Sequence, residues 1–387
     1  MKTSSDRILT THVGSLPRSE AVLDLLRRRE AGEPYDRGGF DSTIRDAVAE
    51  NVRRQVGVGI DIVSDGEASK YGYATYIKDR LEGFGGEAPA KPSLDMHAYP
   101  ELRRRMTVAS FSAAEALRRT CCIGPVRLKD RIALATDIEN FKAALAGADV
   151  ADGFLNAASP GVISAFQANR HYPTHGAYLA ALADAMREEY EAIAGAGFIL
   201  QVDCPDLAMA RHTTFQDLTE PEFLARAEEH IEVLNHALAG IPAGSVRMHV
   251  CWGNYEGPHD HDIALEKLLP ILCKAKPQAI SFEAANPRHE HEWVVWRAAG
   301  LPDDKILIPG VIDSTTNYIE HPELVAQRIG RFADIVGRER VIAGADCGFG
   351  TIAGFSKVDP DIAFRKLATM AAGARIATER LFGPGAA

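Results

Sequence analysis

The chain has 387 residues, of which 46% are apolar and 25% charged, as in an ordinary globular protein. Its 53 acidic and 43 basic residues give a formal net charge of −10, which argues against nucleic acid or an anionic membrane as a partner. No apolar run is long enough for a membrane span, and the first residues do not resemble a secretory signal. The six cysteines are too sparse for a disulfide framework, so we expect a cytoplasmic protein with thiols free for metal binding or catalysis.

The first predicted strand, residues 8–13, breaks at Gly14 and Ser15. Glycine lets backbone amides approach a ligand closely, and the Ser15 hydroxyl and the Arg18 guanidinium can bind a carboxylate or a phosphate. A plain strand-to-helix turn explains the same residues. Gly14, Ser15 and Arg18 are therefore candidate substrate-binding residues.

Residues 57–67 contain the exit of a helix, a buried strand and an acidic loop. Asp65 and Glu67 stand two residues apart in that loop, where they can bind a substrate ammonium or act as a base. A solvated salt bridge, with Lys70 as the partner, is the alternative.

Residues 80–150 are less regular, and their first part, up to Pro100, is rich in Gly, Pro and Ala. We expect this segment to be an insertion after the second strand that covers the site or forms an oligomer contact. Residues 120–128 within it are predicted to form a strand or one arm of a hairpin.

The third and fourth core strands are predicted at residues 153–158 and 198–203, with an amphipathic helix over residues 176–196 between them. Asp203 stands at the tip of the fourth strand. Cys204 points away from Asp203 and is predicted to be structural, because neighbouring strand residues face opposite sides.

The stretch from residue 246 to residue 254 reads as a buried strand running into a loop, with His249 and Cys251 on the same face. An imidazole beside a thiolate suits Zn²⁺. Two later predicted strands end on Glu283 and Cys347, which would complete a His/Cys/Glu/Cys shell. Taken singly, each has a simpler explanation: a packed histidine beside a buried cysteine, a helix cap and a core thiol. Ligand-competent residues at the ends of three strands favour the metal site.

Two other loops are rich in histidine and charge, at residues 258–262 and 286–292. The sequence His289-Glu290-His291 resembles part of a metal site. We expect both loops to be exposed and solvated instead.

Strands predicted at residues 306–313 and 341–347 bring the total to eight, and most are separated by helical stretches. This pattern predicts a (β/α)₈ TIM barrel, α/β in class, formed by residues 1–387 as one catalytic domain. The polar candidates stand at the carboxyl ends of strands, which is the catalytic face of such barrels. We therefore expect a single shared site.

Several short motifs carry a family resemblance along most of the chain. They are Thr10-Thr11-His12-Val13-Gly14-Ser15, Asp65-Gly66-Glu67, Gln201-Val202-Asp203-x-Pro205, His249-x-Cys251, Glu283, Gly310-Val311-Ile312-Asp313 and Asp346-Cys347-Gly348. In these motifs the chain resembles the catalytic half of cobalamin-independent methionine synthase, in the superfamily shared with uroporphyrinogen decarboxylase.

The resemblance implies a zinc ion that binds homocysteine as the thiolate, the form in which a zinc-bound thiol exists. It implies that Gly14 and Ser15 bind the carboxylate of the amino acid, and that Asp203 and Glu67 bind its ammonium. Phe166 falls near the position of a family tryptophan that faces the pterin of methyltetrahydrofolate. The candidate catalytic residues are Asp203, Glu67 and Asp313.

The chain departs from the family in three respects. The family sequence Asp-Glu-Pro reads Asp203-Cys204-Pro205, and Thr315 replaces a histidine thought to help protonate the leaving folate. The family's N-terminal half has no counterpart in this sequence. All three departures concern the methyl donor, and the zinc-thiolate half is intact.

We therefore predict a zinc-dependent transfer of a methyl or alkyl group to a thiol, with homocysteine as the acceptor and methyltetrahydrofolate or another donor. Three alternatives remain open. One is a thiol alkyltransferase that uses coenzyme M with a methylcorrinoid or an epoxide. The others are a decarboxylase on the same barrel and a non-catalytic zinc protein. The expected partners are small molecules, with a homo-oligomer left open.

Overall fold

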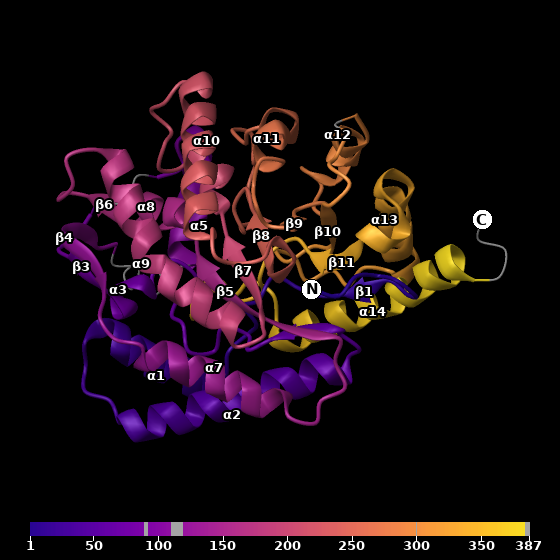
Figure 1. Cartoon of the computed structure of the whole chain (residues 1–387), viewed down its shortest axis with the longest axis horizontal. Helices are drawn as coiled ribbons and strands as arrows, with labels where there is room; N and C mark the ends of the chain where they lie inside the picture. The colour runs from indigo at the N-terminus through magenta and orange to yellow at the C-terminus, as the bar shows by residue number, and fades with distance from the viewer. Residues whose placement is uncertain (89–91, 110–118, 299, 384–387) are drawn as a thin grey trace.

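The computed structural model describes residues 1–88, 92–109, 119–298 and 300–383, and it confirms the predicted barrel (Figure 1). Eight strands pair in the order β1-β11-β10-β9-β8-β7-β5-β2, with parallel ladders between neighbours. The strands are β1 (Leu9–Thr10), β2 (Ile62–Ser64), β5 (Asp152–Ala158), β7 (Ile199–Asp203), β8 (Val246–Val250), β9 (Ala279–Phe282), β10 (Ile306–Ile312) and β11 (Ile342–Ala345).

The seam between β1 and β2, the two ends of this order, is bridged by side chains. The backbone N–H of Thr10 donates to Asp61 Oδ2 at 2.8 Å. The Thr11 hydroxyl donates to the carbonyl oxygen of Ile62 at 3.0 Å. These bonds satisfy strand-edge polar groups that a regular ladder would otherwise pair, so the sheet is nearly closed.

Helices surround the barrel and connect its strands. They are α1 (Glu20–Ala31), α2 (Arg37–Gly57), α7 (Ile132–Leu145), α8 (Pro160–Phe166), α9 (His175–Gly195), α10 (Glu220–Ala237), α11 (Leu265–Leu272), α12 (Trp293–Ala298), α13 (Pro322–Val336) and α14 (Pro360–Phe382). Local sequence signals start several of them: α10 opens with a capping box of Thr219 and Glu222, and Asp359 caps α14 ahead of Pro360. Helix α14 runs alongside β1 and packs against β10 and β11 (Figure 1).

The inside of the barrel is apolar at the amino ends of the strands and polar toward their carboxyl ends. The apolar layer contains Leu9, Ile62, Phe154, Ile199, Ala279, Ile306, Ile308 and Ile342. Above it, the fully buried Arg247 places its guanidinium 3.6 Å from the centroid of the Phe154 ring and donates to Gln201, Thr11 and the carbonyl oxygen of His12. These bonds satisfy the buried charge and form the floor beneath the strand ends.

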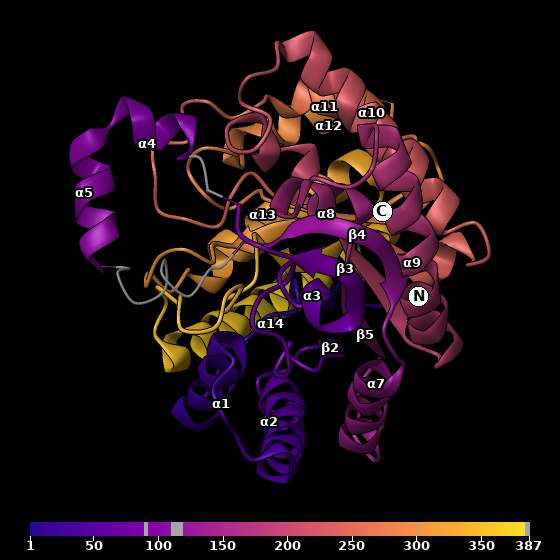
Figure 2. The same cartoon turned by 90° about the vertical axis from the view of Figure 1, so that its left-hand side faces the viewer.

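The chain leaves the barrel pattern between β2 and β5. A small sheet of β3 (Leu81–Gly85), β4 (Cys121–Leu128) and β6 (Ala168–Asn169) lies beside α8 and α9. Helix α3 (Ile77–Arg80) leads into it, and α4 (Leu94–Ala98) and α5 (Pro100–Ala109) project away from the barrel body (Figure 2). Helix α7 packs on α2 in the outer layer, so the last part of residues 80–150 continues the barrel. Within the described ranges, no helix is long and apolar enough to cross a membrane.

Candidate metal centre and substrate cavity

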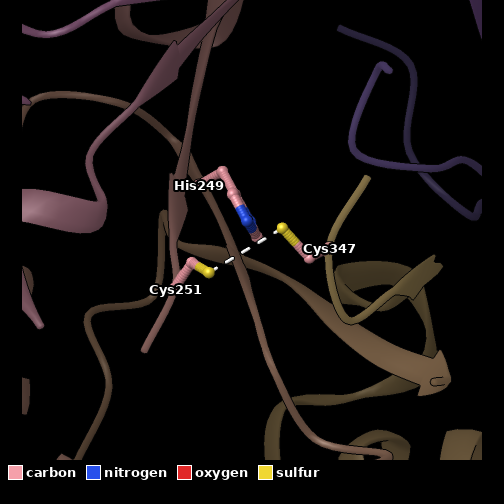
Figure 3. Close-up of side chains that lie close together, drawn as sticks. All are labelled: His249, Cys251 and Cys347. Atoms are coloured by element: carbon pink, nitrogen blue, oxygen red, sulfur yellow. Dashed lines mark hydrogen bonds between the residues drawn. The ribbon is translucent and has the colours of Figure 1, made fainter. Parts of the chain in front are cut away.

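Three predicted metal ligands meet at the carboxyl ends of β8 and β11 (Figure 3). The ligating atoms of His249, Cys251 and Cys347 lie within 4.8 Å of one another, and the three residues are 3–6% exposed. The Cys251 and Cys347 sulfurs are 3.7 Å apart. Two Zn–S bonds of about 2.3 Å at a tetrahedral angle span about 3.8 Å, so this spacing fits one shared ion and is far too long for a disulfide.

His249 meets the other requirement of a metal ligand, an available lone pair. Neither of its ring nitrogens has a hydrogen-bond partner among the described residues, although the ring is buried. Burial, together with the positive charge of Arg247, lowers the pKa of His249 to about 3. The imidazole is therefore neutral, and an unpaired buried imidazole next to two thiols fits a zinc ligand.

Glu283, the fourth predicted ligand, follows β9 directly and lies outside that three-residue group. Its Oε1 accepts from the backbone N–H of Trp252 and its Oε2 from Asn286 Nδ2, both at 2.7 Å. Each carboxylate oxygen keeps a further lone pair, so these bonds orient the group without using up its capacity. Burial and the neighbouring Cys251 raise the pKa of Glu283 well above its usual range, as expected for an acid that lacks a cation.

Asp346 supports this arrangement, a role that sequence analysis did not find. Its carboxylate accepts from the backbone N–H groups of Ala284, Ala285 and Asn286, each at 2.8 Å, and from Asn286 Nδ2 at 3.0 Å. The end of β11 thus holds the loop after β9, and through Asn286 it fixes Glu283. A Cβ on Gly310 would lie 2.0 Å from Asp346 Oδ1, so β10 requires glycine there.

Two buried carboxylates, Asp203 and Glu67, line the cavity that contains the metal ligands. Asn156 and Gln201 donate amide N–H groups to Asp203, whereas Glu67 Oε2 has no partner within the described residues. Burial raises the pKa of Glu67 to about 7 and that of Asp203 to about 6, with Lys70 acting in the opposite direction. Glu67 also has a left-handed backbone, with φ of 53°. Strain and unpaired charge at one acid are typical of a ligand-binding position.

The other acidic-loop candidates organise the backbone. Asp65 Oδ1 accepts from the N–H of Glu67 at 2.9 Å. Lys70 donates to the carbonyl oxygen of Asn156 at 2.6 Å. Arg18 donates to the carbonyl oxygens of Glu67, Lys70 and Gly350. Its guanidinium is therefore engaged by backbone oxygens in this structure, which leaves little of it for a substrate anion.

Gly14 and Ser15 lie where the sequence predicted a close backbone approach. Gly14 has φ of +128°, and a Cβ there would lie 2.2 Å from the Asn156 side-chain oxygen. Ser15 lines the cavity, and a Cβ on Gly348 would lie 2.0 Å from its hydroxyl oxygen. Glycine at both positions lets the end of β1 pack against β5 and the loop after β11.

The cavity has a volume of about 320 Å³ and joins the metal ligands to an apolar wall. That wall includes Tyr73, Met96, Met106, Phe166, Ile352 and Phe355. The ring of Phe166 packs edge-on against Tyr73 with centroids 5.6 Å apart, and the Arg119 guanidinium lies 5.0 Å from the Phe166 centroid. Sequence analysis found only Phe166, through the family resemblance, because no motif or strand end marks the other wall residues.

Comparison with known proteins agrees with this geometry. The sequence profile of the family described as cobalamin-independent synthase, catalytic domain, matches residues 8–117 and 137–374. The chain belongs to this family. The match confirms the resemblance seen in the motifs, and it makes the chain an enzyme of the methyltransferase class.

Two relatives named methionine synthase match this chain over nearly its whole length. That of Saccharolobus solfataricus is 24% identical over 96% of this chain and 95% of its own, and that of Sulfurisphaera tokodaii is 26% identical over 97% and 94%. A solved B12-independent methionine synthase from Shewanella sp. W3-18-1, in complex with selenomethionine, superposes with a TM-score of 0.71. It is 20% identical, with 98% of this chain and all of that chain covered, and it supports the barrel fold.

Asp313, a predicted catalytic residue, lies in a second cavity of about 390 Å³ that also contains Glu283 and Cys347. Both of its carboxylate oxygens are engaged: Oδ1 accepts from the N–H and hydroxyl of Thr315, and Oδ2 from those of Thr316. Thr315, which replaces the family histidine, therefore helps to fold the loop after β10 around Asp313.

The expectation that both histidine-rich loops are solvated is wrong. His259 is 8% exposed and His289 is 3% exposed, because the loops after β8 and β9 pack on each other. Burial alone would lower the pKa of His289, but hydrogen bonds to Asp262 and Glu292 outweigh it and raise that pKa to about 10. In the second loop Pro287, Arg288 and His291 are exposed as expected.

Proposed function

We propose that this enzyme transfers a methyl group to the thiol of homocysteine, with Zn²⁺ held by His249, Cys251, Glu283 and Cys347. The main observation behind this proposal is the unpaired, neutral His249 imidazole, which lies beside two thiols 3.7 Å apart. All three groups lie in the same cavity as two buried carboxylates. The name methionine synthase, borne by relatives of nearly equal length, supports the acceptor.

The donor set determines which ion fits and what that ion adds. Two thiolates and an imidazole are the ligands that zinc prefers over magnesium or calcium. A thiol with a pKa near 8.5 is mostly protonated at neutral pH, and zinc bound here would supply the positive charge that makes it a thiolate. The chain fixes its ligands at three strand ends, so little rearrangement accompanies binding.

The amino-acid part of homocysteine carries one positive and one negative group, and the cavity offers a complement to each. Asp203 and Glu67 are the acceptors for the ammonium, whose positive charge would add to that of nearby Lys70 in offsetting these buried acids. The Ser15 hydroxyl, beside Gly14, is the donor for the carboxylate. Both ends of the amino acid would thus be held while its sulfur lies among the metal ligands.

The apolar wall is the place for the methyl donor. Tyr73 and Phe166 present aromatic surfaces on which a flat ring can pack, and the surrounding methionines exclude water from the sulfur. We propose methyltetrahydrofolate as the donor on this basis. A sulfonate thiol such as coenzyme M is disfavoured as acceptor, because it carries no ammonium for Asp203 and Glu67 to bind.

The test combines metal content with turnover. We expect wild-type enzyme to bind zinc through these residues, and Cys347→Ser to lower zinc affinity and methionine formation by at least 100-fold, because one of four ligands is lost. Cys273→Ser, at a half-buried cysteine outside the cavity, is the matched control and should keep both. Methyltetrahydrofolate and methylcobalamin are compared as donors, and homocysteine and coenzyme M as acceptors.

Two results would refute the proposal. Unchanged zinc affinity in Cys347→Ser would show that Cys347 is not a zinc ligand and would refute the proposed metal site. Turnover of coenzyme M but not homocysteine would reassign the acceptor and with it the role of Asp203 and Glu67.

A further inference from the structure

A second cluster of ligand-type side chains lies in the loops after β8 and β9. His259 Nδ1 is 2.8 Å and His289 Nε2 is 3.0 Å from the same oxygen, Asp262 Oδ2. Suitable atoms of the three residues lie within 4.8 Å of one another. Their side chains are at most 10% exposed. This cluster takes no part in the methyl transfer proposed above.

The outer nitrogen of each imidazole faces an oxygen that can only accept a hydrogen bond. His259 Nε2 lies 3.1 Å from the carbonyl oxygen of Tyr255. His289 Nδ1 lies 2.9 Å from the Glu292 carboxylate. In the neutral form of each imidazole, which is the form that binds a metal ion, these contacts place the single N–H on the outer nitrogen. The inner nitrogens, which face Asp262, then carry lone pairs.

With both imidazoles neutral, Asp262 is a buried carboxylate without a donor. Its Oδ2 faces the two inner nitrogens, and its Oδ1 accepts no hydrogen bond from the described part of the chain. His212 Nε2 lies 3.6 Å from Oδ1 but is only 2.9 Å from the carbonyl oxygen of Trp252, to which its N–H is directed. Leaving such a carboxylate uncompensated is costly, so the cluster requires added positive charge.

Protons on the imidazoles or one divalent cation can supply that charge. In the absence of an ion, His289 is the group that takes up a proton, since Asp262 and Glu292 raise its pKa to about 10. Two protons would turn both imidazoles into cations bonded to one oxygen, which places like charges side by side in a buried site. A divalent ion would instead accept both lone pairs and bind the carboxylate. The outer contacts to a carbonyl and a carboxylate are those that orient metal-bound imidazoles.

We propose that His259 Nδ1, His289 Nε2 and the Asp262 carboxylate bind a second divalent transition-metal ion, of the Zn²⁺ type. Two nitrogens and one oxygen are a donor set that suits such ions, with a fourth position left for solvent. His259 lines the 390 Å³ cavity, which gives the ion a path from solvent. The site is separate from the one at Cys251 and Cys347.

This ion would fasten together the two loops that continue from the proposed zinc ligands. The loop from Cys251 to Asp262 and the loop from Glu283 to His289 meet at the cluster. The Trp252 indole stacks on His289 with ring centroids 4.4 Å apart, and its backbone N–H bonds Glu283. We therefore expect the second ion to have a structural role: it would hold the two loops that carry residues of the first metal centre.

The experiment measures zinc per chain by mass spectrometry after equilibration with zinc and removal of excess. We expect two ions in wild type, one in His289→Gln, and two in His291→Gln, the exposed histidine of the same loop. A Cys251→Ser, Cys347→Ser double variant should retain one ion. The proposal of a second site would be refuted if His289→Gln bound as many zinc ions per chain as wild type, or if the double cysteine variant bound none.

Cobalt(II) titration of the double cysteine variant gives an independent readout that survives failure of the first site. Cobalt bound only by nitrogen and oxygen should show ligand-field absorption without thiolate-to-cobalt charge transfer, and Asp262→Asn in this background should weaken binding by at least 10-fold. Absent cobalt binding, or binding indifferent to Asp262→Asn, would mean that two protons hold the cluster. If His289→Gln does not fold, this titration decides alone.

Discussion

Replacing Asp203 by asparagine should weaken homocysteine binding and stabilise the empty protein at the same time. Asp203 is 4% exposed and accepts from Asn156 and Gln201. Asparagine keeps the shape and can place its carbonyl oxygen at the Oδ1 position, where Gln201 donates. It removes one buried negative charge and the Oδ2 acceptor of Asn156, which keeps its longer contact of 3.3 Å at the Oδ1 position.

The loss in binding follows from that burial. Truncating one partner of a buried, hydrogen-bonded charge pair costs about 2–5 kcal/mol, and each 1.4 kcal/mol is a factor of ten. Because Glu67 still faces the ammonium, we expect the lower end of that range, a rise in KM for homocysteine of about 30-fold. The thiol 3-mercaptopropionate lacks the ammonium, so its KM should change less than threefold.

The same substitution should stabilise the folded protein near neutral pH, because the buried charge of Asp203 destabilises it there. Burial raises the pKa of Asp203 from 3.8 to about 6. Because the folded-state pKa lies above the unfolded one, the relative stabilisation is complete below pH 4 and is lost as the pH rises through 6. A displacement of this size corresponds to about 3 kcal/mol. Urea unfolding of wild type should therefore show a decline in unfolding free energy between pH 4 and 7, and Asp203→Asn should show a smaller one.

The pair of results is the test. A higher KM together with undiminished stability at pH 7 identifies Asp203 as a charge retained for the substrate. A variant that is less stable at pH 7 and binds both thiols equally poorly would show that the carboxylate is a structural acceptor, and the reasoning from its pKa would be refuted.

Two further predictions concern other residues. Gly310→Ala should lower the unfolding free energy by about 1–3 kcal/mol and weaken zinc binding, because the new Cβ meets Asp346 at 2.0 Å. Gly330→Ala is the control, because Gly330 faces open space on α13. Equal effects of the two substitutions would contradict the packing argument. KM for homocysteine should rise as the pH falls below about 7, the pKa to which burial raises Glu67, because its protonated form no longer attracts the ammonium. A flat profile in wild type, or a rise that persists in Glu67→Gln, would exclude this role.

The barrel and the meeting of His249, Cys251 and Cys347 could be predicted because their signals are local and repeated. His249 and Cys251 share a strand face by spacing alone, and Cys347 belongs to another strand end that a parallel barrel must bring to the same rim. The roles of Arg18 and Asp313 could not be predicted in this way. Their partners are backbone carbonyls for Arg18 and the threonines of a turn for Asp313, which depend on loop conformations that residue spacing does not specify.

The buried histidines show a second limit of composition. His259 and His289 stand among charged and turn-forming residues, which is the usual pattern of a solvated loop. Their burial arises because two loops pack on each other, and because Asp95, from the projecting α4, accepts from the backbone N–H of His259 at 3.0 Å. The Asp262–His289 contact joins residues 27 positions apart and the Asp95–His259 contact joins residues 164 positions apart, so no local window contains them.

Glu283 connects the barrel fold with the proposed zinc chemistry. One of its oxygens is held by the Trp252 N–H at the end of β8, and the other by Asn286, which Asp346 at the end of β11 anchors. The carboxylate is therefore positioned only when β8, β9 and β11 lie side by side in the closed barrel. Zinc affinity must then depend on folding, and bound zinc must stabilise the three strand ends that create its site.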